Sequence, residues 1–318
     1  MSDFLNAVFT ILVLANVPPV IAQVPVENPA NDNPVKIIFE TDMCTDVDDV
    51  GALATLHALV DLQEAEILAV GYNEVHPNGA AAIDAINTWY GRGNIPIGVY
   101  KRPLRGPDES GYLLETARFP NDLPTDPEDL PSAVDVYVQV LNNQPDSSVT
   151  IVSVGFLSNL ADLLDGHSGL ISRKVKKLVI MGGLIDDAWN LVRHDLVETS
   201  QKIFEGWPTP IVISQEGADI RTGQDLQYSS VDNPVRASYY HYFGQQFDSR
   251  SSWDQMAVLF AVRGLKYFEL HSDGSGKLSN GFVLQMEPGW RSYLTNTLSN
   301  REFEDLINQL MTNPPAGR

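Results

Sequence analysis

Short apolar runs alternate with amphipathic stretches along most of the chain. Nearly continuous apolar runs predict strands at 35–39, 66–72, 94–100, 148–155, 175–181 and 209–214. Stretches of helical periodicity follow at 48–60, 80–90, 133–141, 156–164 and 253–262. This alternation predicts one α/β domain with a largely parallel central sheet, helices on both faces and a Rossmann-like core. Ligands in such sheets bind beyond the carboxyl ends of the strands.

Three further stretches lie outside this alternation. Residues 101–132 are rich in proline, aspartate and glycine, and a connection this long predicts a functional loop. Residues 266–287 contain a turn rich in glycine and serine, which predicts a hairpin. Ser299 and Glu302 form a capping box, so we expect the last helix to start there.

Acidic residues are concentrated directly after the first predicted strand. Five of them fall within ten residues: Glu40, Asp42, Asp46, Asp48 and Asp49. Carboxylates held this close repel one another unless a cation or a shared proton lies between them. A hard divalent cation with oxygen ligands is the simplest relief, so the stretch predicts a cation site. Helix capping is the alternative for Asp48 or Asp49, but it does not account for the whole set.

The N-terminal residues predict export. Residues 4–22 are mostly apolar and end in Val20-Ile21-Ala22, which fits the cleavage site of a signal peptide. Pro18 and Pro19 interrupt the run and disfavour a membrane span. We therefore expect a signal peptide over 1–22, a linker over 23–34 and one domain over 35–318, with a secreted or periplasmic protein. No lysine or arginine precedes the apolar run, so an N-terminal extension of a cytoplasmic protein is the alternative.

Composition narrows the range of partners. Acidic residues outnumber basic ones by 41 to 21, and the net charge of −20 argues against nucleic acid or an anionic membrane as a partner. The hydrophobic share of 43% is sufficient for a substantial core. Cys44 is the one cysteine, so no intramolecular disulfide can form. The sequence leaves open whether the protein forms a homo-oligomer.

The acidic stretch resembles the long signature of the inosine-uridine preferring nucleoside hydrolase family, D-T-D-M-G-[ND]-D-x-D-D. It departs from that signature at Glu40, where aspartate is usual, and at Cys44, where glycine is usual. Segments 152–159, 179–190, 207–211 and 252–255 resemble further family segments in the same order. The resemblance therefore spans most of the chain, and it implies a nucleoside-hydrolase-like domain that takes a small nucleoside or riboside.

The resemblance also implies a Ca²⁺ cofactor and the residues that hold it. The implied ligands are Asp42, Asp49, Asp254 and the backbone carbonyl of Val154. Asp42 is in addition the implied base that deprotonates the attacking water. The implied substrate-binding residues are Asp48, Asn190, Asn73 and Trp253, and Asn78 competes with Asn73 for its place.

Two substrate-side positions depart from the family pattern. Trp253 stands where purine-active relatives have a histidine thought to protonate the leaving base, and Ala188 stands where they have an acid. Asp186 or Asp187 are open as substitutes for that acid. His194 lies between charged neighbours, which favours a surface position. Because an indole cannot supply the proton, we expect ribosides with good leaving groups to be hydrolysed better than inosine.

These inferences predict a calcium-dependent hydrolase of N-ribosidic bonds in which water activated by Asp42 attacks C1′. A non-catalytic, calcium-dependent riboside-binding or sugar-binding protein of the same fold is the alternative, which the departures at Ala188 and Trp253 favour. A phosphatase with Asp42 as nucleophile would need a lysine and a serine or threonine in set contexts. A Cys44 thiol nucleophile has no base placed beside it by the sequence.

Overall fold

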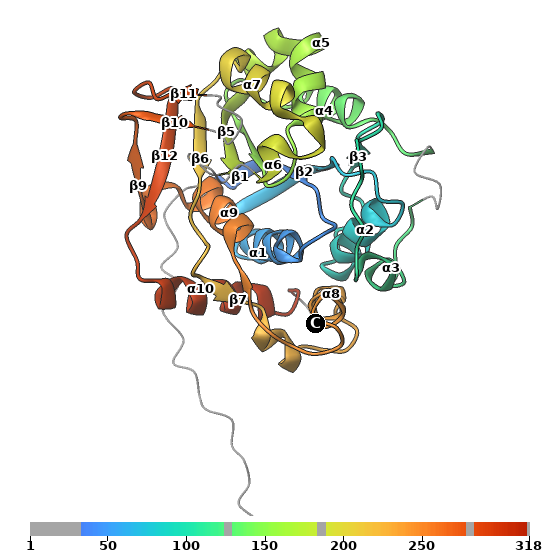
Figure 1. Ribbon diagram of the computed structural model, residues 1–318. Coiled ribbons are helices and arrows are strands. Elements are labelled where there is room, and N and C mark those ends of the chain that lie inside the picture. The colour runs from blue at the N-terminus through green and yellow to red at the C-terminus, as the bar shows by residue number, and fades with distance from the viewer. Residues whose placement is uncertain (1–32, 124–128, 183–188, 278–282, 317–318) are drawn as a thin grey trace, which may run out of the picture. The chain divides into compact units, whose positions relative to one another are not determined.

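A sheet of eight strands forms the centre of the unit Asn31–Arg318 (Figure 1). The computed structural model describes residues 33–123, 129–182, 189–277 and 283–316, so the expected signal peptide and nearly all of the linker lie outside the described residues. The strands lie side by side in the order β3 (Ile97–Val99), β2 (Ala65–Tyr72), β1 (Val35–Thr41), β4 (Val149–Ser153), β5 (Val175–Met181), β6 (Ile211–Ser214), β12 (Arg291–Asn296) and β9 (Phe268–His271).

The pairing confirms the predicted parallel sheet. Every neighbouring pair of strands is parallel except β12 and β9, which are antiparallel. All six strands predicted from apolar runs are present. Strand β3 is shorter than predicted and begins after Pro96, which lacks the N–H group that a ladder needs. Strand β12 was not predicted, because its sequence RSYLTN carries few apolar residues.

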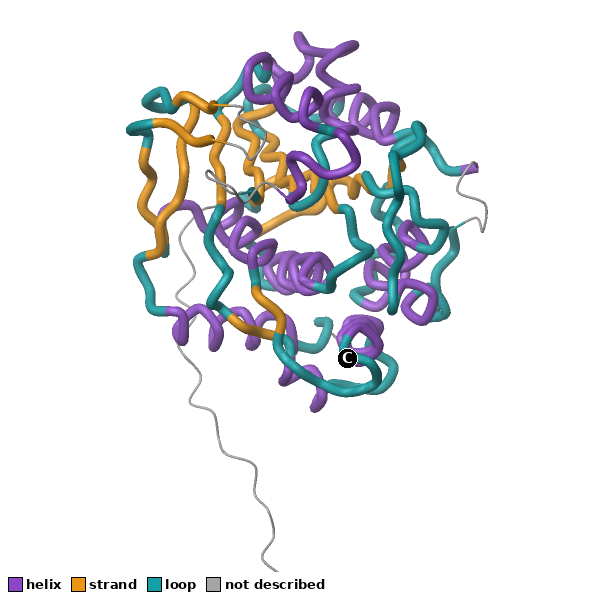
Figure 2. Tube along the Cα trace, viewed as in Figure 1, coloured by secondary structure: helices purple, strands orange, loops and turns teal. Residues whose placement is uncertain are grey.

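Helices cover both faces of the sheet (Figure 2). Side chains of β1 alternate between two cores: Ile37 and Phe39 pack in one and Ile38 in the other. The first core is completed by α1 (Asp48–Asp61), α2 (Gly79–Trp89), α9 (Trp253–Arg263) and α10 (Asn300–Thr312). The second is completed by α4 (Ala133–Asn142), α5 (Ser158–Lys174) and α7 (Val197–Gly206). Burial on both faces explains why the central strands are almost wholly apolar.

Shorter elements connect this framework. The loop 101–132 carries α3 (Leu113–Thr116), and α8 (Pro234–Tyr242) begins after Asn233, whose side chain accepts from the backbone N–H of Val235. The predicted hairpin is present as β10 (Ser275–Lys277) and β11 (Val283–Gln285), which pair antiparallel, whereas β9 from the same stretch joins the central sheet. The remaining elements are α6 (Trp189–Val192), β7 (Arg221–Thr222), β8 (Arg250–Ser251) and the 3-10 helices η2 (Arg193–Asp195), η3 (Gln224–Tyr228) and η4 (Gly264–Lys266).

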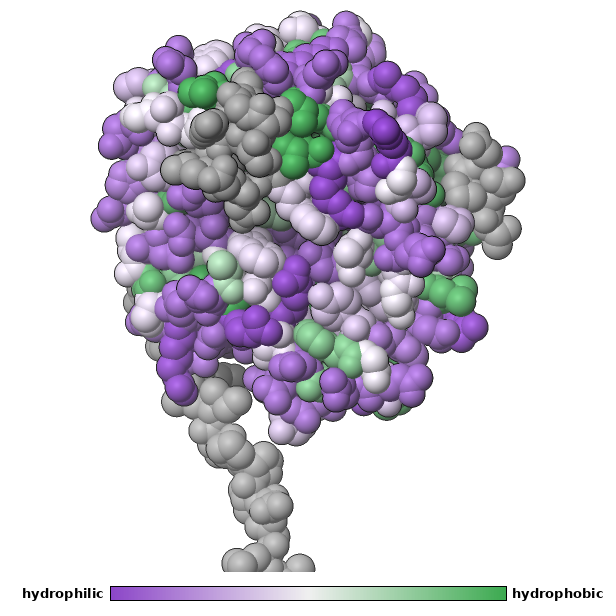
Figure 3. All heavy atoms as spheres, viewed as in Figure 1, coloured by the Kyte–Doolittle hydropathy of each residue, from purple (hydrophilic) through white to green (hydrophobic). Residues whose placement is uncertain are grey.

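The visible face of the molecule is mostly hydrophilic, and its apolar atoms lie in small separate groups (Figure 3). This agrees with a composition in which acids outnumber bases by 41 to 21. Among the described helices, none combines the length and apolar character that a membrane span requires.

A histidine buried in the first core predicts that the folded protein loses stability at acidic pH. His57 of α1 is fully buried, stacks on Tyr90 and has its Nε2 at 2.8 Å from Asn87 Oδ1. Burial lowers the pKa of His57 from 6.5 to about 3. Between these values the unfolded chain binds a proton that the folded chain does not, so stability falls as pH falls.

We expect the free energy of unfolding to fall by about 1.4 kcal/mol for each pH unit below about 6 on account of His57. Urea denaturation at several pH values would measure this fall. The His57→Gln variant should lack it, whereas His241→Gln, in half-buried surroundings on α8, should keep the parent dependence. Equal acid sensitivity of His57→Gln and the parent would contradict the assignment.

Candidate active site

A cavity of about 300 Å³ opens where β1, β4 and β5 end. Three groups of side chains line it, from segments that are distant in sequence. The acids are Asp42, Asp46, Asp48, Asp49 and Asp254, the aromatic residues are Trp189, Tyr242 and Trp253, and Asn190, Arg250, Thr45, Met181 and Val154 complete the wall. The cavity thus lies at the edge of the sheet at which the sequence predicts a ligand.

The hydroxyl group of Thr41 holds the loop between β1 and α1 against the first turn of α1. Thr41, the last residue of β1, donates a hydrogen bond from Oγ1 to Asp49 Oδ1 and accepts one at 3.1 Å from the backbone N–H of Met43. Gly155 allows the turn after β4 to approach this loop, because a Cβ there would lie 2.4 Å from the backbone nitrogen of Asp42. The acidic stretch and the Val154 carbonyl therefore reach the same cavity.

Asp254 comes to the cavity from the other end of the chain, in the first turn of α9. The backbone N–H of Ser252 donates to the carbonyl of Gly217 at 3.0 Å, and the Ser252 hydroxyl lies 2.8 Å from that of Thr222. Gly217 has φ of +127°, and a Cβ there would lie 2.6 Å from the backbone of Trp253. This close backbone approach fixes the start of α9 beside the acidic loop.

Electrostatics in the cavity favour a cation. Burial, and after it repulsion from neighbouring carboxylates, raises the pKa of Asp42, Asp48, Asp49 and Asp254 well above the usual range of an aspartate. Asp254 Oδ1 is buried without a hydrogen-bond partner in the described part of the chain, whereas Asp48 Oδ1 forms an ion pair with Arg250 Nε at 3.4 Å. Buried carboxylate oxygens are the ligands that a hard divalent cation takes, so the acids of the cavity suit a cation of that class.

Val154 and Asn190 are directly connected in the cavity wall. The Asn190 side chain donates from Nδ2 to the Val154 carbonyl at 2.6 Å. A carbonyl oxygen has two lone pairs, so this bond leaves one of them available to a second partner. Asn190 keeps its side-chain oxygen for another contact.

Neither Asn73 nor Asn78, which compete for one predicted place, lines the cavity. Asn73 Nδ2 donates to Glu40 Oε2 at 2.6 Å, and Asn73 Oδ1 accepts from the backbone N–H of Phe156 at 3.0 Å. Glu40 lies fully buried at the end of β1, where Tyr137 and Asn159 also donate to its carboxylate. Both polar side-chain atoms of Asn73 thus have partners outside the cavity, so we leave Asn73 out of the sugar-binding set.

Arg250 is a cavity residue that the sequence did not indicate. Its guanidinium donates to Asp46 Oδ2 at 2.7 Å and lies 4.8 Å from the ring centre of Trp253. The nearby carboxylates of Asp48 and Asp46 oppose the effect of burial and raise the pKa of Arg250. Arg250 therefore places a permanent positive charge beside the indole.

The position Ala188 and its neighbours Asp186 and Asp187 lie outside the described residues.

The structure bears on two other residues of the sequence analysis, and the interpretation changes only for His194. His194 does not lie at the surface, because its side chain is 3% exposed and packs edge-on against Phe156 at 4.8 Å. Cys44 is buried, and burial together with nearby carboxylates raises the pKa of its thiol. A thiol that resists ionisation is a poor nucleophile, so the structure gives no support to chemistry at Cys44.

Three comparisons with solved structures agree on the fold. The inosine-uridine preferring nucleoside hydrolase of Bacillus anthracis aligns at TM-score 0.65 with 17% identity, over 87% of this chain and 99% of that one. A purine-preferring ribonucleoside hydrolase of Gardnerella vaginalis aligns at 0.63 with 16% identity, over 87% and 98%. The type III effector XopQ, solved with adenosine diphosphate ribose, aligns at 0.64 with 13% identity, over 90% and 94%.

Sequence comparison adds the family. An uncharacterized protein of Schizosaccharomyces pombe is 27% identical over 167 residues, and the match spans about half of each protein. The family model described as inosine-uridine preferring nucleoside hydrolase matches residues 37–198, just over half of the 318 residues. Its span contains the acidic loop, Val154 and Asn190, which are the segments that build most of the cavity wall. The chain therefore belongs to the inosine-uridine preferring nucleoside hydrolase family.

Proposed function

We propose that this protein is a calcium-dependent hydrolase of N-ribosidic bonds in nucleosides or related ribosides. The observation that carries the proposal is the convergence of Asp42, Asp48, Asp49 and Asp254 with Asn190 on one cavity of about 300 Å³. A cavity of this size suits a small ligand. The adenosine diphosphate ribose in the XopQ structure is a riboside, which supports the same ligand class here.

The proposed roles follow from position. Asp42, Asp49, Asp254 and the Val154 carbonyl would hold the calcium ion, which when bound supplies positive charge that acidifies and orients a water molecule. Asp42 takes the proton of the attacking water, because its carboxylate lies on the wall of the cavity in which the water would be held. Asp48 and the Asn190 side chain bind the ribose hydroxyl groups, because a carboxylate accepts hydrogen bonds and an amide oxygen accepts them too.

The leaving group faces a wall that stacks and carries positive charge. Trp253 and Tyr242 offer aromatic faces, Arg250 lies beside Trp253, and no histidine lines the cavity within the described residues. An arginine does not release a proton, so it stabilises negative charge without acting as an acid. A base that must be protonated before it leaves is therefore a poor substrate.

We expect a nitrophenyl riboside to be hydrolysed with a kcat about 10²–10⁴-fold above that for inosine, since general-acid assistance is typically worth that factor. Steady-state kinetics on both substrates in excess calcium would measure the ratio. Trp253→His should raise inosine turnover selectively. Comparable rates on the two substrates in the parent would show that a general acid reaches the leaving base.

The alternative is a riboside-binding protein without catalysis, which the missing histidine favours. Measuring both the release of ribose and the binding of ribose distinguishes the hydrolase from the binding protein, because only the hydrolase releases ribose from a riboside. Full-length protein treated with chelator and then restored with calcium should hydrolyse the nitrophenyl riboside, and chelator alone should abolish the reaction. Binding of ribose in calcium without any hydrolysis would establish the non-catalytic alternative, and hydrolysis unaffected by chelator would overturn calcium dependence.

A further inference from the structure

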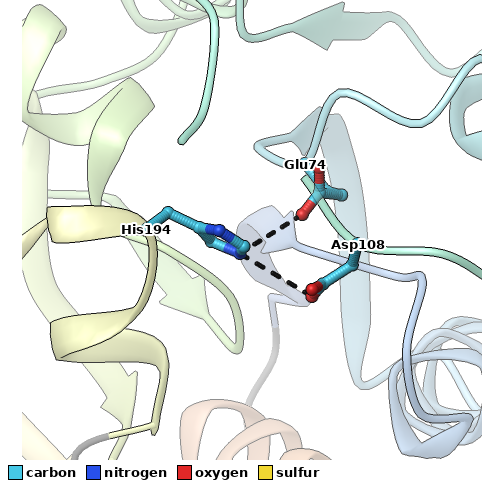
Figure 4. A group of neighbouring side chains, drawn as sticks. All are labelled: Glu74, Asp108 and His194. Carbon is cyan, nitrogen blue, oxygen red and sulfur yellow. Dashed lines mark ion pairs between the residues drawn. The ribbon is translucent and has the colours of Figure 1, made fainter. Parts of the chain in front are cut away.

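A cluster of two carboxylates and one imidazole lies outside the cavity wall. Glu74 follows β2, Asp108 lies in the loop 101–132, and His194 belongs to η2. Their side chains point toward one another, and ion-pair lines join His194 to both carboxylates (Figure 4). One ligand atom from each residue lies within 4.8 Å of the other two.

Each of the three side chains has one heteroatom anchored by the protein. Glu74 Oε1 accepts from the backbone N–H of Val75 at 2.7 Å. Asp108 Oδ1 accepts from Arg193 Nη2. His194 Nδ1 lies 3.0 Å from the carbonyl oxygen of Arg105, which only accepts, so Nδ1 carries the proton. In the neutral imidazole, this tautomer has the lone pair of Nε2 facing the other two residues.

The second heteroatom of each residue faces a common point. His194 Nε2 lies 3.6 Å from Glu74 Oε2 and 3.7 Å from Asp108 Oδ2, too far for hydrogen bonds. Glu74 Oε2 and His194 Nε2 are buried and have no hydrogen-bond partner among the described residues, and their side chains are 0% and 3% exposed. Buried polar atoms without partners are costly, so the arrangement calls for a ligand.

The separations suit a metal ion of the zinc class. Metal–ligand bonds of about 2.1 Å at tetrahedral angles place neighbouring ligand atoms about 3.4 Å apart, close to the separations around Nε2. An imidazole nitrogen favours zinc and its transition-metal neighbours over calcium, which takes oxygen ligands. Anchoring of the second histidine nitrogen by a carbonyl is the usual outer contact of a metal-bound histidine.

We propose that Glu74, Asp108 and His194 form a binding site for a divalent transition-metal ion, with Zn²⁺ as the representative, distinct from the calcium site proposed in the cavity. The ion ties the loop 101–132 and the loop after β2 to the segment that follows α6. Because α6 carries Asn190, the site secures one wall of the cavity.

The test uses the full-length protein, stripped of metal and then saturated with calcium so that the cavity carboxylates are occupied. Calorimetric titration with Zn²⁺ should show one tight site. Titration with Co²⁺ should give the visible absorption of a low-coordinate nitrogen and oxygen site. X-ray absorption of the Zn²⁺ form should show imidazole nitrogen and oxygen at about 2.0–2.2 Å and no sulfur at about 2.3 Å, which excludes Cys44 as a ligand.

Variants locate the site. His194→Gln and Glu74→Gln should each lower Zn²⁺ affinity by more than the roughly 10–100-fold typical of an outer-shell partner. Two controls should bind Zn²⁺ as the parent does. His271→Gln removes a more exposed histidine that also faces a carboxylate, Glu269, at 3.8 Å, and Asp254→Asn removes a proposed calcium ligand.

Several results would overturn the proposal. These are no Zn²⁺ binding by the folded parent, unchanged affinity in both His194→Gln and Glu74→Gln, or equal loss of affinity in His271→Gln. If His194→Gln does not fold, Glu74→Gln, which has almost the same shape, and the X-ray absorption spectrum of the parent decide the matter. A spectrum without imidazole scattering would contradict the site.

Discussion

Asp42→Asn is expected to lower kcat for nitrophenyl riboside hydrolysis by about 10²–10⁴-fold at saturating calcium, the range typical of a lost general base. Asparagine keeps the shape of aspartate but cannot take a proton from water. Asp42 follows β1 directly and lies on the cavity wall. Without a cation, burial, and after it the charges of Asp46 and Glu74, raises the pKa of Asp42, so its carboxylate is ready to take up a positive charge.

The measurement must separate the base from the metal ligand, because we propose both roles for Asp42. Calcium affinity of Asp42→Asn is therefore measured by calorimetry, and kcat is compared at calcium concentrations that saturate each protein. Asp225→Asn, an exposed acid of η3, removes the same charge elsewhere and should keep the parent kcat. A kcat of Asp42→Asn within threefold of the parent would exclude Asp42 as the base.

The apolar pattern of the sequence was sufficient to predict the sheet and the acidic loop, and the family resemblance indicated further residues of the cavity wall. The nearly continuous apolar strands alternate with helices along the chain, and this order is typical of a parallel sheet with helices on each face. Such a sheet brings the carboxyl ends of β1 and β4 to one edge. The acids after β1 lie at that edge, as the strand pattern indicated. Val154 and Asp254, which only the family resemblance indicated, line the same cavity, and the close approaches at Gly155 and Gly217 place their segments there.

Positions set by particular side-chain contacts could not be predicted. Glu40 occupies the place of an aspartate, and its longer side chain accepts from Asn73, which is thereby held outside the cavity. His194 is buried because Phe156 packs against its ring, although its neighbours in sequence are charged. Strand β12 is recruited through pairing with β6, which its own composition does not indicate. Each outcome depends on residues that are distant in sequence.

The second large effect is expected on stability, and it arises from the negative charge of the cavity carboxylates. Asp254 is 2% exposed, its Oδ1 has no hydrogen-bond partner among the described residues, and Asp48 and Asp49 repel its carboxylate. Without a cation, these charges destabilise the folded protein. With calcium at 100 times its Kd, the folded state should gain about 2.7 kcal/mol. The Asp254 carboxylate thus destabilises the protein without calcium and stabilises the protein that has bound calcium.

Asp254→Asn should therefore raise the stability of the protein in chelator and lower it in calcium, relative to the parent. In chelator we expect the variant to be more stable than the parent by about 1–3 kcal/mol, since a buried charge without a partner has been removed. In calcium the order should reverse, because the variant has lost a ligand and gains little from the ion. Thermal unfolding of both proteins in chelator and in calcium measures the four stabilities. Asp219→Asn, an exposed acid, should follow the parent in both conditions. If Asp254→Asn gained as much stability from calcium as the parent, Asp254 would not be a ligand, and the cation would be held by the acids of the β1–α1 loop alone.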